Sequence, residues 1–144
     1  MKQTITVETS VQAPRETVWS YWTEPEHIMR WYHASDDWGV PSAKNDLHVG
    51  GRFVIRMEAN DGSAGFDFSG TYTDVRKYDE IGYAIDDGRI VRVTFSWQGD
   101  SCLVTETFES EVVHPVELQR SGWQSILDTF KKYVETSESD AHAS

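Results

Sequence analysis

The chain has 144 residues, of which 38% are hydrophobic and 26% charged, with aromatic residues at 12%. This composition is typical of one globular domain and excludes a disordered chain, which would carry fewer large apolar groups. The formal net charge of -11 argues against nucleic acid or an anionic membrane surface as a partner, because both require clustered lysine and arginine.

No segment of the sequence is long enough to span a bilayer, since the longest apolar runs, such as Phe53-Val54-Ile55, have three residues. The N-terminus lacks the apolar centre of a signal peptide, so we expect a cytoplasmic protein. The single cysteine, Cys102, excludes an internal disulfide and a metal site built from several thiolates. Its apolar neighbours predict a buried structural thiol.

The first third of the chain predicts one strand and two short helices. Residues 4–11 alternate between polar and apolar side chains, the period of a half-buried strand. Pro14 suits the first turn of a helix, which we expect to end near Thr23. The sequence Thr23-Glu24-Pro25-Glu26 has the form of a capping box and predicts a second helix over residues 24–31.

Residues 32–46 show no hydrophobic period and are rich in turn-forming residues, so we predict a long ordered loop. Its polar side chains could line a cavity mouth or hold a cation. Their spacing matches no zinc or calcium signature, and turns and capping explain them more simply, so we predict no metal site. The side chains concerned are His33, Asp36, Asp37, Trp38, Asn45 and Asp46, with His48 just beyond.

Regular alternation then predicts strands over residues 52–59, 66–75, 81–85, 91–97 and 102–108, joined by short turns rich in Gly, Asn and Asp. Gly50 and Gly51 predict a bulge or a close backbone approach. Short turns between neighbouring strands indicate an antiparallel sheet with one apolar face that needs a cover.

The cover is a long helix that begins at His114-Pro115. Its apolar residues Trp123, Ile126, Leu127, Phe130 and Val134 share one face. Gly122 either lets the helix backbone, or a large neighbour such as Trp123, settle against a curved sheet, or belongs to a loop before a helix that starts at Trp123. We predict an α+β fold, with a single domain over residues 1–135 and a flexible polar tail over residues 136–144.

The alternation also predicts a wall of large side chains that faces the helix across an apolar interior. Aromatic walls around a few polar groups are typical of small-molecule pockets, although a filled core has the same pattern. The candidate ligand-binding residues are Trp31, Phe53, Ile55, Met57, Phe68, Tyr72, Tyr83, Phe95, Trp97, Glu106, Trp123, Leu127 and Phe130.

Glu106 is the most informative of these residues because it shares strand parity with the apolar Cys102 and Phe108. An inward carboxyl group must be paired, hydrogen-bonded to a tyrosine such as Tyr72 or Tyr83, or protonated through a raised pKa. A bulge would instead turn it to solvent. We expect Glu106 to be an acid that orients a ligand.

Several short motifs occur together in one order along the chain. They are Ala13-Pro14-Arg15-Glu16-Thr17-Val18-Trp19, Thr23-Glu24-Pro25-Glu26 leading to Trp31, Val49-Gly50-Gly51-Arg52-Phe53, Gly70-Thr71-Tyr72, and Gly122-Trp123 with Leu127. From about residue 4 to residue 135 the chain resembles the activator of heat-shock-protein-90 ATPase homologue-like family, within the START-related helix-grip (SRPBCC) superfamily. The resemblance implies a curved antiparallel sheet of six or seven strands that grips a long C-terminal helix, often around an apolar cavity.

The resemblance also implies a function, because such folds commonly hold lipids, polyketides or other small apolar molecules. Our first hypothesis is therefore a domain that encloses an apolar or amphipathic ligand. Since some members are cyclases or hydrolases, the second is an enzyme that uses Glu106 and a tyrosine. The third is a co-chaperone-like interaction module with an acidic surface.

Other features of the sequence limit these hypotheses. The eukaryotic chaperone activators have a separate N-terminal chaperone-binding domain without a counterpart in these 144 residues, so we do not expect direct chaperone activation. No catalytic triad order or phosphate-binding loop is found, and we assign no catalytic residue and no cofactor. Homodimerisation through a sheet edge stays open.

Overall fold

Antiparallel pairing joins seven strands into one sheet in the order β1-β7-β6-β5-β4-β3-β2. The structure is a computed structural model that describes the backbone of residues 3–143 and the side chains of residues 3–137. The strands are β1 (Thr4–Val11), β2 (Trp38–Asn45), β3 (Arg52–Ala59), β4 (Gly65–Arg76), β5 (Glu80–Ile85), β6 (Ile90–Trp97) and β7 (Cys102–Glu109), and the helices are α1 (Arg15–Thr23), α2 (Pro25–Trp31) and α3 (Val116–Ala143). The predicted α+β class and the two short helices after the first strand are confirmed.

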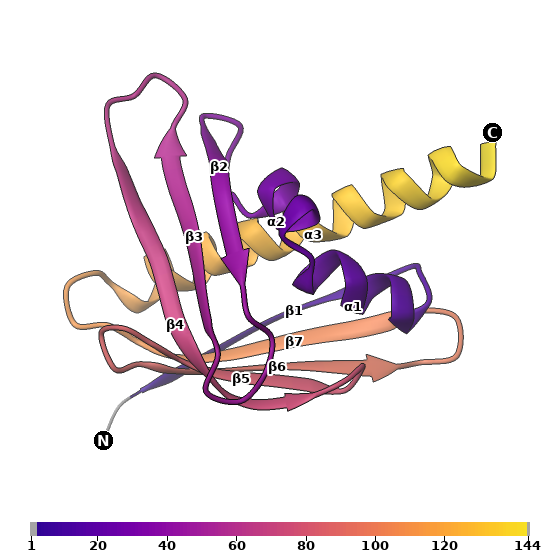
Figure 1. The fold of residues 1–144 in the computed structure, drawn as a ribbon, viewed down its shortest axis with the longest axis horizontal. Helices are drawn as coiled ribbons and strands as arrows, with labels where there is room; N and C mark the ends of the chain where they lie inside the picture. Colours follow the sequence, from indigo (N-terminus) through magenta and orange to yellow (C-terminus); the bar gives the residue numbers. More distant parts are fainter. Residues whose placement is uncertain (1–2, 144) are drawn as a thin grey trace.

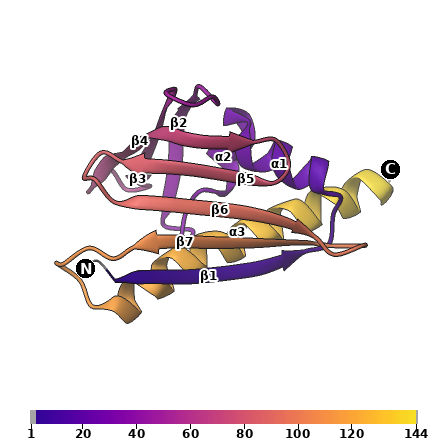
Figure 2. The same ribbon diagram turned by 90° about the horizontal axis from the view of Figure 1, so that it is seen from below.

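The sheet curls strongly around α3. In Figure 1, β1, β5, β6 and β7 form a layer below α3, while β2, β3 and the start of β4 rise steeply beside the helix. Figure 2 shows α3 running along that layer, with α1 and α2 on the same side of it. The register of the β4–β5 pairing shifts between Tyr72 and Asp74. Because a bulge bends its strand, this shift accounts for the change in direction of β4.

The middle turns of α3, from Leu127 to Val134, fill the interior of the curl. Leu127, Phe130 and Val134 are fully buried, and the ring of Phe130 meets those of Trp22 and Trp31 edge to face at 4.9 and 4.6 Å between centroids. Burial of side chains this large stabilises a fold by about 1.5–3 kcal/mol each. The predicted packing of the helix against the sheet is confirmed.

Polar contacts fix α3 against β1. The Lys131 ammonium group donates a hydrogen bond to the carbonyl oxygen of Ser10 (2.6 Å), and the Gln124 amide donates to that of Glu8 (3.1 Å).

Within the described residues, no helix is long and apolar enough to cross a membrane.

The predicted loop over residues 32–46 is wrong over most of its length, because residues 38–45 form β2. The strand pairs with β3 at the edge of the sheet, and its register shifts between Gly39 and Ser42. Pro41 lies in that irregular stretch, as proline in a strand generally does. The shift breaks the alternation, so no period of two was visible in the sequence.

The capping box predicted at Thr23 is also wrong. The hydroxyl group of Thr23 belongs to α1 and donates a hydrogen bond to the carbonyl oxygen of Trp19 (2.8 Å). Glu24 occupies the N-cap position of α2 without a side-chain capping bond. Pro25 at the start of the helix is sufficient to initiate it, because its backbone angle is already helical.

The predicted close approach at Gly51 is confirmed, since a Cβ atom there would lie 2.1 Å from the carbonyl oxygen of Asp46. The loop interpretation of Gly122 is wrong, because Gly122 lies well inside α3, which begins at Val116. The helix backbone makes no close approach to the sheet there, since a Cβ atom on Gly122 would meet nothing within 4 Å. That Gly122 lets Trp123 settle against the sheet stays a prediction. The backbone of α3 continues to Ala143, so helix covers most of the predicted tail; its flexibility and the domain limit at residue 135 stay predictions.

The substitution Gly122→Ala should raise the free energy of unfolding by about 1 kcal/mol, because alanine restricts the unfolded chain and favours helix. Denaturation in urea would measure the change. Gly70→Ala is the matched control with the opposite expected sign, by about 1–3 kcal/mol, since its Cβ atom would lie 2.5 Å from the Ala84 carbonyl oxygen. Destabilisation by Gly122→Ala would contradict the interpretation that the position is free of contacts.

Candidate functional site

A cavity of about 200 Å³ lies between the N-terminal half of α3 and the raised part of the sheet. We call it the main cavity. Aromatic groups form much of its wall, and Glu106 and Arg89 are its two charged residues. Its lining consists of Tyr32, Met57, Phe66, Phe68, Arg89, Glu106, Trp123 and Ile126.

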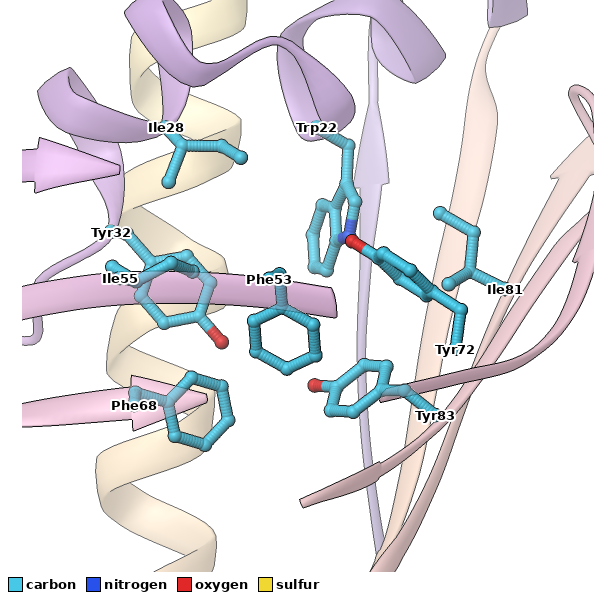
Figure 3. A pocket seen from close by; sticks show the side chains of 9 residues that line it. All are labelled: Trp22, Ile28, Tyr32, Phe53, Ile55, Phe68, Tyr72, Ile81 and Tyr83. Atoms are coloured by element: carbon cyan, nitrogen blue, oxygen red, sulfur yellow. The ribbon is translucent and has the colours of Figure 1, made fainter. Parts of the chain in front are cut away.

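A smaller inner cavity of about 30 Å³ adjoins the main cavity, since Tyr32 and Phe68 line both. Its volume suits one or two water molecules. Figure 3 shows its lining residues, Trp22, Ile28, Tyr32, Phe53, Ile55, Phe68, Tyr72, Ile81 and Tyr83. The hydroxyl groups of Tyr32 and Tyr83 point toward the same space below Phe53 (Figure 3).

The structure brings most of the predicted site residues to these two cavities. Phe53, Ile55, Phe68, Tyr72 and Tyr83 line the inner cavity, and Met57, Phe68, Glu106 and Trp123 line the main cavity. Trp31, Leu127 and Phe130 belong instead to the filled core, and Phe95 packs edge to face against Trp19 and Trp22. Whether the lining residues bind a ligand stays a prediction.

The prediction that Trp97 faces the interior is wrong, because its side chain is 43% exposed. Trp97 is the last residue of β6. Its parity matches that of the buried Phe95, but parity only assigns a face of the sheet. Whether another element covers that part of the face depends on the tertiary fold.

Several lining residues were not predicted from the sequence. Trp22, Ile28 and Tyr32 reach the inner cavity from α1, α2 and the segment after α2, and only their helical apolar spacing could have indicated burial. Phe66, Arg89 and Ile126 line the main cavity. Ile126 was visible on the apolar face of the helix, whereas nothing in a hairpin sequence indicates that Arg89 meets a cavity.

Glu106 points inward, as its strand parity predicts, and is only 3% exposed. Among residues 3–137, no hydrogen bond or ion pair reaches its carboxyl group. Burial raises the pKa of Glu106 to about 8, because a charged carboxylate loses its hydration there. At neutral pH the group is therefore mostly a neutral acid that can donate one hydrogen bond into the main cavity.

Two tyrosines lie close to Glu106. Burial raises the pKa of Tyr32 and of Tyr83 well above the usual value for a phenol, and the nearby Glu106 carboxylate contributes in the same direction. Tyr72, the other predicted partner, is engaged elsewhere, because its hydroxyl group donates a hydrogen bond to the side-chain oxygen of Asn45. Glu106, Tyr32 and Tyr83 are therefore three neutral acids that lie near one another in the interior.

Three of the polar residues predicted after α2 have structural contacts, whereas the buried Nδ1 atom of His33 has no hydrogen-bond partner in the described part of the chain. The Asn45 amide donates a hydrogen bond to the Thr23 carbonyl oxygen (2.6 Å) while accepting the one from Tyr72. Asp46 and His48 form an exposed ion pair (2.8 Å). Within the described residues, no group of three or more His, Cys, Asp or Glu side chains could hold a metal ion.

The family model described as "Activator of Hsp90 ATPase homolog 1-like protein" (AHSA1) matches residues 12–135. The chain belongs to this family. The resemblance inferred from the ordered motifs is therefore confirmed, and so is the helix-grip fold of the SRPBCC superfamily. This fold commonly binds ligands. No curated protein matches this AHSA1-like chain.

Solved structures agree with this assignment. The AHSA1-like protein from Aeromonas hydrophila is 44% identical, with a TM-score of 0.90 over 94% of each chain. Chr148 from Cytophaga hutchinsonii is 51% identical, with a TM-score of 0.80 over 94% of each chain. CV1439 from Chromobacterium violaceum, 21% identical, has a TM-score of 0.81 over 92% of this chain and 96% of its own, which shows the fold alone.

The burial of Glu106 gives this AHSA1-like protein a pH-dependent stability. Between the ordinary value of 4.5 and the raised pKa of about 8, the native state keeps a proton that the unfolded state loses. The free energy of unfolding therefore falls as pH rises through this window, by up to about 1.4 kcal/mol per pH unit from this group, and levels off above it. Glu106→Gln removes this effect, so its stability relative to the wild type should increase from pH 4.5 to pH 8.

Urea unfolding at fixed ionic strength measures the difference at each pH. Glu16→Gln is the control, because Glu16 is exposed and its charge is hydrated in both states, so its curve should follow the wild type. A constant offset between Glu106→Gln and the wild type over the whole pH range would show that Glu106 is not buried as an acid.

Proposed function

We propose that this protein binds a small apolar or amphipathic molecule, lipid-like or polyketide-like, in the main cavity between the sheet and α3. The observation that carries the proposal is the cavity of about 200 Å³ whose aromatic wall contains a buried carboxyl group, that of Glu106, without a partner among residues 3–137. Ligand pockets are mostly apolar and contain a few polar groups that orient the ligand.

The shape of this space supports the same proposal. Protein interiors are close-packed and contain few voids larger than a water molecule, so a space of about 200 Å³ beside the buried Glu106 is suited to a ligand. Larger side chains at Met57 or Ile126, which both line the space, would fill it.

An enzymatic use of the same cavity is the second candidate. A carboxylic acid with a pKa of about 8 is suited to general acid catalysis near neutral pH, and Tyr32 and Tyr83 are close to it. A cyclase or hydrolase would lose turnover in Glu106→Gln while it still binds its ligand. Retention of turnover in that variant would exclude this mechanism.

Activation of the Hsp90 ATPase appears in the name of the matched family, and a chaperone-interaction module was the third hypothesis. None of the described residues gives a specific observation in its favour. An interaction through the acidic surface would not require the main cavity. It would therefore survive a substitution that fills the cavity, which separates it from the first two candidates.

Filling the cavity tests the proposed function. Ile126 lines the main cavity from α3, so Ile126→Trp should place an indole inside it and weaken binding of the neutral fluorescent probe N-phenyl-1-naphthylamine by about tenfold or more, a loss of about 1.4 kcal/mol. Fluorescence titration measures the affinity.

Ser121→Trp is the matched control, because Ser121 lies on the exposed side of the same helix and should leave the affinity unchanged. Circular dichroism confirms that both variants are folded. The proposal is wrong if the wild type does not bind the probe, or if a folded Ile126→Trp binds it as well as the wild type does.

A further inference from the structure

A surface depression adjoins the main cavity at the end of the molecule where the β5–β6 hairpin and the β7–α3 connection lie side by side, at the left of Figures 1 and 2. Arg89 and Trp123 line both spaces, so the depression is the outer part of a path that leads to Glu106. Arg89, which follows the Asp86-Asp87-Gly88 turn, therefore lies where a ligand would pass from solvent into the cavity.

The guanidinium group of Arg89 is held in place by its own hairpin. Its side chain is 17% exposed. The Asp87 carboxylate accepts a hydrogen bond from the backbone N–H of Arg89 (3.0 Å) and another from its Nε (2.9 Å). Among residues 3–137, no acceptor takes a hydrogen bond from its two terminal nitrogens. A pre-positioned guanidinium group with free Nη donors is suited to a carboxylate or similar anion.

Glu111, an acidic residue that lines the depression, is already paired with His114. Glu111 Oε1 accepts a hydrogen bond from the backbone N–H of His114 (2.8 Å) and also contacts the ring of His114. This pairing lowers the pKa of Glu111, with a small contribution from Arg89. Glu111 therefore adds negative charge near Arg89, but it accepts no hydrogen bond from the Arg89 guanidinium group.

The polarity of the path favours an anion over a cation. Arg89 is permanently charged, and its guanidinium is the only cationic group among the described residues that line the main cavity. The Glu106 carboxyl group at the inner wall has no cationic partner among residues 3–137, and its burial keeps it mostly protonated at neutral pH. Both polar groups therefore present hydrogen-bond donors to a ligand.

We infer that the ligand is an amphipathic anion, with a carboxylate or comparable acidic group at Arg89 and an apolar, preferably aromatic body in the main cavity, packed against Trp123 and Phe68. A carbonyl, ether or phenol oxygen on the inner end of that body accepts the hydrogen bond from Glu106. The inference rests on the proposed function and adds to it the charge and the orientation of the bound molecule.

Trp123 and Phe68 are arranged to hold a flat body. The indole of Trp123 stacks on the ring of Phe108 (3.8 Å between centroids, 9° between planes) and meets Phe68 edge to face at 6.2 Å. Because Phe108 supports one face of the indole, the orientation of Trp123 is fixed before a ligand arrives.

A matched pair of fluorescent probes tests the inference. N-Phenyl-1-naphthylamine is neutral, and 8-anilinonaphthalene-1-sulfonate has the same ring system with an added sulfonate. The wild type should bind the anionic probe about tenfold more tightly than the neutral one at pH 7. Arg89→Gln should abolish this preference and leave the affinity for the neutral probe within about twofold, which also shows that the variant is folded. Arg89→Lys should keep part of the preference.

Arg92→Gln is the charge-matched control. Arg92 is 53% exposed on β6, between Val91 and Val93, which face the core, so its side chain lies on the opposite face of the sheet and its loss should leave both affinities unchanged. Equal affinity of the wild type for both probes would overturn the inference and leave the proposed function intact. An equal loss for both probes in Arg89→Gln would also overturn it. If neither probe binds the wild type, the proposed function fails and the inference fails with it.

Discussion

The packing of one helix against one bent sheet produces both the core and the cavity of this protein. The middle turns of α3 pack Phe130 edge to face against Trp22 and Trp31, which also contact each other, so this part of the interior is filled. The N-terminal half presents Trp123 and Ile126 to the raised strands β3 and β4, and their side chains do not close the gap. Stability and a ligand-sized space are thus assigned to different turns of the same helix.

The position of Glu106 depends on this division. Its neighbours of equal parity on β7, Val104 and Phe108, are almost completely buried, so the pleat of the sheet requires Glu106 to point inward as well. A carboxyl group in a filled core would need a partner. In this fold it faces a cavity, where burial keeps it mostly protonated at neutral pH. The main cavity therefore explains how the fold tolerates a carboxyl group at Glu106.

Strand parity and helical periodicity predicted most of the fold, because they report which side chains share a face. The inward direction of Glu106 and the wall formed by Phe53 and Ile55 follow directly from a period of two. The same reasoning fails where tertiary contacts decide. β2 is stabilised by pairing with β3 across an irregular register, and Trp97 has the parity of a core residue but no cover. Arg89 lines the site because a hairpin and a loop distant in sequence meet, which leaves no local pattern.

Gly122 connects the stability of α3 with access to the site. A glycine within a helix costs about 1 kcal/mol relative to alanine, and no close contact in the structure compensates for it, because a Cβ atom there would lie in open space. That space belongs to the surface depression, which Gly122 lines together with Arg89 and Trp123. A large side chain at this position would project into the path that leads past the guanidinium group. The absence of a side chain keeps the depression wide beside Arg89, and this is the entrance that the proposed amphipathic ligand would use.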